Sequence, residues 1–84
     1  MKITYESRWN ERDEKLKNAS CSAYVGRIKL GDVYCIVRDT EIIPVSYEGF
    51  SFLKDRLIDE LLLSLNDSFN WDIQFHLNEI DGIA

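Results

Sequence analysis

The sequence contains few prolines and glycines, which interrupt helices and strands, and few cysteines and histidines, which form disulfides and metal or catalytic sites. It has one proline, one histidine, two cysteines and four glycines among 84 residues. The low glycine and proline content excludes collagen-like and low-complexity chains. Two cysteines are too few for a disulfide framework or a structural zinc site. We therefore expect a reducing, cytoplasmic location.

Long apolar runs are also missing. The longest in the predicted helix covers residues 61–63, whereas a membrane span needs roughly 18 or more apolar residues. Residues 1–17 are polar and lack the apolar core of a signal peptide. We expect neither a membrane span nor a leader. The length suits a single domain, residues 1–84, with one modest core.

Basic residues are absent after Arg56. Residues 49–84 contain two basic and seven acidic side chains, so they carry the whole net charge of −5, while residues 1–48 are balanced. An acidic surface repels phosphate backbones and attracts basic partners. Alternatively, the negative net charge only keeps the protein soluble and marks no binding surface.

The first half of the chain predicts strands. Residues 2–9 alternate between apolar and polar side chains, which indicates a strand. Residues 8–17 are mostly charged and fit a solvated loop or a short helical turn. Residues 21–30 and 33–38 predict a hairpin with Gly31-Asp32 as its two-residue turn. This register puts Cys21 and Cys35 on opposite faces of the sheet.

The next predicted strand covers residues 42–47. We expect a three-residue loop, residues 39–41, before it, because this loop keeps the apolar side chains on the core face. Pro44 cannot donate a hydrogen bond to a neighbouring strand, which indicates a sheet edge or a bulge. The side chains expected on the core face are Ile43, Val45 and Tyr47.

Residues 49–66 are predicted to form an amphipathic helix. Its apolar stripe consists of Phe50, Leu53, Leu57, Ile58, Leu61, Leu62 and Leu65. Residues 71–77 then alternate as a half-buried strand. The predicted fold is an α+β two-layer sandwich in the order β-β-β-β-α-β. One helix packs on a mainly antiparallel sheet of four or five strands.

Catalytic and metal-binding patterns are weak. His76 could pair with Cys21 as base and nucleophile, and Asp55, Asp59 and Glu60 could hold Mg²⁺. Acidic residues are also common on any solvent-exposed helix face. The spacing of Cys21 and His76 in the sequence does not favour a catalytic pair. No phosphate loop, nucleophile elbow or zinc-protease motif is present. We therefore expect a protein that is not an enzyme, without catalytic residues, metal or cofactor.

The outer side of the predicted helix is the leading candidate site. Phe52, Arg56, Asp59 and Leu63 fall on one line down its back. Apolar anchors within an acidic surround are typical of a protein interface. This pattern predicts a small inhibitor or binding module, of the immunity, antitoxin or phage anti-defence kind, that occupies a basic partner surface. The expected partner-binding residues are Phe52, Asp55, Arg56, Asp59, Glu60, Leu63 and Asp67.

Two further functions stay open. The face of the sheet that carries Arg27, Lys29, Tyr34 and Arg38 could bind single-stranded nucleic acid through phosphate contacts and ring stacking. The alternatives are that this face of the sheet is exposed to solvent and binds nothing, or that the N-terminal segment covers it. The third hypothesis is a structural homodimer that closes over this face or over the Phe52–Leu63 line.

Residues 45–57, Val-Ser-Tyr-Glu-Gly-Phe-Ser-Phe-Leu-Lys-Asp-Arg-Leu, resemble the strand–glycine–helix junction of HicB-type antitoxin domains. The resemblance implies a β-β-β-α-β order for the chain around this junction. It does not extend to the first 20 residues, and a shared fold does not by itself assign a function.

Overall fold

The computed structural model confirms the two-layer α+β arrangement, with five strands in one sheet. It describes residues 2–13, 15–69 and 74–78. The strand order is β1-β2-β3-β4-β5, antiparallel except for the parallel pair β4–β5. The elements are β1 (Thr4–Arg12), β2 (Lys15–Val25), β3 (Ile28–Arg38), β4 (Glu41–Gly49), the 3₁₀ helix η1 (Ser51–Leu53), α1 (Lys54–Ser68) and β5 (His76–Leu77).

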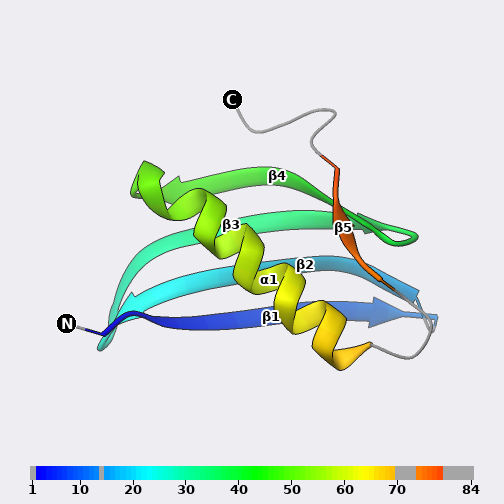
Figure 1. The fold of residues 1–84 in the computed structure, drawn as a ribbon, viewed down its shortest axis with the longest axis horizontal. Coiled ribbons are helices and arrows are strands. Elements are labelled where there is room, and N and C mark those ends of the chain that lie inside the picture. Colours follow the sequence, from blue (N-terminus) through cyan, green and yellow to red (C-terminus); the bar gives the residue numbers. More distant parts are fainter. Residues whose placement is uncertain (1, 14, 70–73, 79–84) are drawn as a thin grey trace.

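Helix α1 crosses one face of the sheet diagonally, from the end of β4 towards β1 (Figure 1). Its apolar stripe is buried as the 3.6-residue period predicts. Phe50 is the exception: it precedes the helix and is 55% exposed. The core consists of Ala19, Cys21, Ala23, Val33, Cys35, Val37, Ile42, Leu53, Leu57, Ile58, Leu61, Leu65 and Phe75.

Most of the charged residues 8–17 that the structure describes belong to strands. β1 extends to Arg12 and β2 begins at Lys15. Asp13 has a φ of 55°, a left-handed conformation that aspartate tolerates better than most side chains. The expectation of a loop or a helical turn is therefore wrong for most of this segment, because the backbone pairing of the hairpin outweighs its polarity.

The turn between β2 and β3 lies at Gly26-Arg27, and the predicted turn at Gly31-Asp32 is wrong. Val25 pairs with Ile28, and Gly26 takes the positive φ of 60° that a tight hairpin turn needs. Gly31 lies within β3 instead. A Cβ atom at Gly31 would stand 2.7 Å from the Tyr47 hydroxyl of β4 and 3.3 Å from Leu57 Cδ1, so the glycine makes room for both side chains.

A bulge in β3 decides which residues share the core face. Ala23 pairs with Gly31 while Tyr24 pairs with Lys29, so Leu30 is an extra residue in its strand. The extra residue reverses the alternation beyond it. Cys21 and Cys35 therefore lie on the same face, both buried and both as free thiols. Their predicted placement on opposite faces is wrong for this reason.

β4 follows a two-residue turn, Asp39-Thr40, because Arg38 pairs directly with Glu41. The predicted three-residue loop is wrong. Ile42 and Pro44 face the core, Ile43 and Val45 face outwards, and a bulge beside Pro44 returns Tyr47 to the core side. The bulge expected from the proline is therefore present. It explains why the apolar set splits between the two faces.

The last strand was expected over residues 71–77. Residues 70–73 lie outside the described part of the chain, and β5 comprises only His76 and Leu77. Asn66 of α1 anchors the approach to it: the Phe75 N–H donates to Asn66 Oδ1 at 2.6 Å, and Asn66 Nδ2 donates to the Phe75 carbonyl at 3.2 Å. This pair of hydrogen bonds ties the segment before β5 to the helix.

Candidate functional site

The predicted partner-binding residues share one exposed side of the helical segment. At about 100° per residue, their positions occupy an arc of about 140°, opposite the buried stripe. Six of them are in α1 and Phe52 is in η1. We call this set the α1 outer surface: Phe52, Asp55, Arg56, Asp59, Glu60, Leu63 and Asp67.

Two apolar side chains on this surface are turned to solvent. Phe52 is 75% exposed and Leu63 is 66% exposed. Eleven residues separate them, or about 16 Å along a helix axis. The N-terminal segment does not cover Phe52, because β1 pairs with β2 at the edge of the sheet. Phe52 and Leu63 are therefore available as contact residues.

Arg56 is the single cation on the α1 outer surface, and its charge is shared between two neighbours. Its Nη2 lies 2.8 Å from Glu60 Oε1, and its guanidinium lies 5.3 Å from the centroid of the Tyr5 ring. The ion pairs among the described residues involve none of Asp55, Asp59 and Asp67. Within the part of the chain that the structure describes, these three carboxylates beside Phe52 and Leu63 thus have no ion-pair partner.

Sequence reasoning missed a second exposed aromatic side chain beside Phe52. Phe50 was assigned to the buried stripe, but its ring centroid lies 5.7 Å from that of Phe52. The Phe50 N–H donates to the Leu30 carbonyl at 3.2 Å, which holds this residue at the end of the sheet. The sequence signal was Gly49, which marks the end of a strand. Phe50 itself has an extended backbone (φ −69°, ψ 128°), so the helical period begins only after it.

The residues proposed for nucleic-acid binding do not converge. Lys29, Tyr34 and Arg38 share the outer face of β3, whereas Arg27 lies in the β2–β3 turn. Lys29 and Arg38 are nine residues apart, or about 30 Å along a strand. The N-terminal segment does not cover this face. Tyr34 is only partly exposed, at 38%.

Acidic side chains interrupt the same outer face. Asp32 lies opposite Glu48, and Arg38 lies opposite Glu41. Ser22 is fully buried there, where it accepts a hydrogen bond from Arg8 and donates one to Asp32. The outer face is therefore mixed in charge, and does not form the basic strip that tracks a phosphate backbone.

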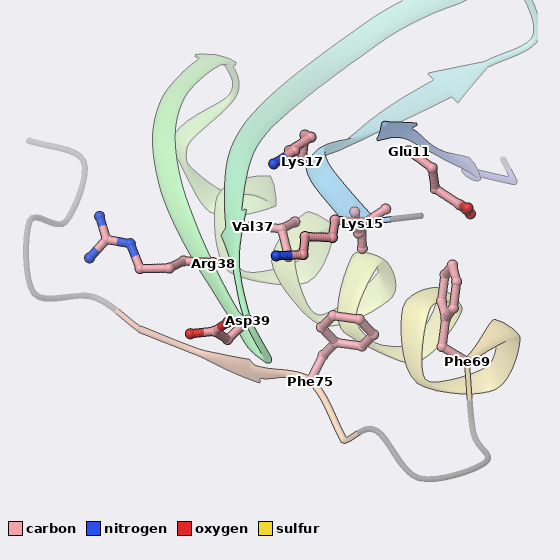
Figure 2. Close-up of a pocket in the computed structure, with 9 residues that line it drawn as sticks. Glu11, Lys15, Lys17, Val37, Arg38, Asp39, Phe69 and Phe75 are labelled. Atoms are coloured by element: carbon pink, nitrogen blue, oxygen red, sulfur yellow. The ribbon is translucent and has the colours of Figure 1, made fainter. Parts of the chain in front are cut away.

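An open cavity of about 410 Å³ lies at the end of the sheet near the C-terminus of α1 (Figure 2). Leu16, Val37, Phe69 and Phe75 provide its apolar lining. The rim contains both charge signs: Glu11, Lys15, Lys17, Arg38 and Asp39. In Figure 2 the guanidinium of Arg38 points away from the hollow. The sequence did not predict this cavity, because its lining residues come from five separate segments of the chain.

The described residues do not assemble the Cys/His pair considered above. Cys21 is buried in β2, and His76 lies in β5 at the opposite side of the sheet, where its Nε2 is 3.6 Å from Glu41 Oε1. No group of three or more His, Cys, Asp or Glu side chains that could hold a metal ion occurs within these residues.

Burial sets the protonation of the two thiols. It raises the pKa of Cys35 to about 12, with the nearby Cys21 as a smaller cause. Burial is also the main reason why the pKa of Cys21 is raised. Both thiols are therefore protonated at neutral pH and act as small apolar core residues.

We expect alkaline solution to destabilise the fold through these thiols. The Cys35 thiol has an ordinary pKa of 9.0 and a folded value of about 12, so the folded state holds the proton more tightly. Its stabilising contribution is complete below about pH 9 and is lost as the pH rises, at up to about 1.4 kcal/mol per pH unit. Urea denaturation between about pH 7 and pH 10.5 measures this loss. Cys35→Ala should have a shallower slope, and equal slopes would contradict the assignment.

No family model, curated protein or solved structure matches this chain. The resemblance of residues 45–57 to HicB-type domains is therefore a local likeness at one junction. The sheet also has a further strand, β1, before the β-β-β-α-β order of that family. Among the described residues, no helix is both long enough and apolar enough to cross a membrane.

Proposed function

We propose that this protein is a small acidic binding module that inhibits or neutralises a partner protein by occupying a cationic surface of it. The α1 outer surface makes the contact. One observation carries the proposal: Phe52 and Leu63 are exposed on the same side of the helix as Asp55, Asp59 and Asp67, whose charges the described residues leave unpaired.

The two kinds of side chain have separate tasks. Carboxylates steer the approach of a cationic partner and raise the association rate. Apolar side chains at the centre of an interface lose water on contact and slow dissociation. Phe50 extends the apolar contact beside Phe52. A module of the immunity, antitoxin or phage anti-defence type fits this description, because it needs a contact surface and no catalytic groups.

The experiment removes the two contributions separately. The partner is captured from the cells that make this protein, identified, purified and titrated with each variant. Asp55→Asn, Asp59→Asn and Asp67→Asn together should lower the association rate about tenfold or more in dilute salt. The difference should shrink in about 0.5 M salt, because screening then acts over a few ångströms. Phe52→Ala with Leu63→Ala should instead raise the dissociation rate at least about tenfold.

A matched control removes the same number of charges elsewhere. Glu11→Gln, Asp13→Asn and Glu48→Gln change exposed residues of β1, its turn and β4. This variant has the same net charge as the α1 triple variant and should keep nearly native association. If both triple variants bind alike, bulk charge and not the α1 outer surface explains the attraction, and the proposal is wrong.

Nucleic-acid binding is the weaker alternative. Lys29 and Arg38 stand at opposite ends of β3, and Asp32, Glu41 and Glu48 lie on the same face. Phosphate backbones would meet repulsion from those carboxylates. The observations therefore favour a protein partner at the helix over a nucleic acid at the sheet.

A further inference from the structure

β1 leaves one long edge of the sheet unpaired. It pairs with β2 on one side, and no described strand follows it on the other. The strand is nine residues long and contains no proline. Such an edge presents a row of backbone donors and acceptors to another strand. It is a ready site for pairing with a second chain.

The opposite edge is far less suited to pairing. There, β5 already pairs with the first two residues of β4, Glu41 and Ile42. Beyond it, Pro44 lacks an N–H group and a bulge interrupts the strand. These features are common protections against edge-to-edge association. The described part of β1 has only one such interruption, the register shift between Asn10 and Glu11.

The regular part of β1 therefore runs from Thr4 to Asn10, and its central residue is Ser7. Two antiparallel copies of this segment related by a two-fold axis at Ser7 would pair fully. Because the register is centred on a residue, opposed side chains point to the same side of the joined sheet. The two α1 helices would therefore lie on the same side of it. The two sheets would then continue into each other.

The side chains of this register are self-complementary. Glu6 of each copy lies opposite Arg8 of the other, and Tyr5 lies opposite Trp9. Opposite charges and aromatic pairs are the cross-strand partners that stabilise antiparallel sheets. A shift of the axis to Glu6 or to Arg8 would place like charges against each other. The charge pattern thus favours the register centred on Ser7 over the registers centred on its two neighbours.

We propose that two copies of this chain associate through their β1 strands, antiparallel and centred on Ser7, into one continuous sheet. This interface goes beyond the proposed function and uses different residues. It also differs from closure over the outer sheet face or over the Phe52–Leu63 line. Symmetric two-fold dimers are the commonest protein oligomers.

Sedimentation velocity in dilute salt tests the charge pairing. The native protein should change from monomer to dimer over the micromolar range. Glu6→Arg alone and Arg8→Glu alone each create two like-charge pairs per dimer and should weaken self-association about tenfold. An equimolar mixture of the two variants should recover it, because every pair in the mixed dimer is then opposite in charge. The doubly exchanged variant, E6R with R8E, should recover it as a homodimer.

The native ion pair and hydrogen bond at Arg8 require a check on folding. Arg8 Nη1 lies 3.9 Å from Glu6 Oε1, and Arg8 Nη2 donates to Ser22 Oγ at 3.3 Å. Circular dichroism and melting temperature are therefore compared first. Recovery in the mixture cannot come from unfolded chains, so it separates lost pairing from lost structure.

Cysteine pairing tests the register itself. In the proposed dimer Thr4 lies opposite Asn10 of the partner, whereas the two copies of Thr4 are about 20 Å apart. Thr4→Cys with Asn10→Cys should give a disulfide-linked dimer under mild oxidation, while either single variant should not. A native protein that stays monomeric up to about 200 µM, far above a micromolar dissociation constant, would overturn the proposal. So would a dimer that neither charge reversal weakens, or linking by both single variants alone.

Discussion

Replacing Gly49 with alanine is expected to cause the largest loss of stability among the single substitutions considered for this fold. Gly49 has a φ of 126°, a conformation that side-chain-bearing residues rarely adopt. An added Cβ would meet the Leu30 carbonyl oxygen and lie 2.5 Å from Gly31 Cα. Both are backbone atoms of a paired strand and cannot move aside. We expect a loss of about 3 kcal/mol or more, measured by urea denaturation.

Gly26 provides the matched control for this substitution. It also has a positive φ, of 60°, but an added Cβ would have no atom within 4 Å. Gly26→Ala therefore costs only the conformational strain, about 1–2 kcal/mol. A chain of this size has a total stability on the order of 4–13 kcal/mol. Equal losses at the two glycines would show that the close packing of Gly49 on β3 is not significant.

Leu61→Ala is expected to be the second large loss, about 2–5 kcal/mol. Leu61 is fully buried between α1 and the sheet, and truncating it leaves a cavity that the paired strands cannot fill. Leu63 lies two residues away and is mostly exposed, so Leu63→Ala should change stability by less than about 0.5 kcal/mol. Thermal or urea denaturation measures both.

The Leu63 result also bears on function. If Leu63→Ala leaves the fold intact, any loss of partner binding in that variant comes from the surface and not from the core. A substantial destabilisation by Leu63→Ala would mean that this side chain packs against the protein, which would remove one of the two apolar anchors from the α1 outer surface.

The helix was the easiest element to predict because its signal is local. Leu57, Leu61 and Leu65 repeat at the helical period, and a helix shows the same face to the sheet wherever it packs. The same arithmetic placed Phe52 and Leu63 on the opposite side, where the structure finds both exposed. The candidate surface could therefore be predicted from residue spacing alone.

Gly31 shows why the strand register could not be predicted. A glycine followed by aspartate is a strong local turn signal, yet here the glycine lies inside β3. Its small size makes room for the side chains of Tyr47 and Leu57. These residues belong to β4 and α1, more than 15 residues later in the chain, so no local rule contains the requirement.

The amino-acid sequence by itself determined the order of the elements, the buried stripe of α1 and the acidic character of its other side. These depend on periodicity and charge, which are properties of neighbouring residues. Only the tertiary structure decided the register of β3 and β4, the common face of Cys21 and Cys35, and the open edge at β1. A single bulge reverses every side chain beyond it, and packing across the whole sheet determines where each bulge forms.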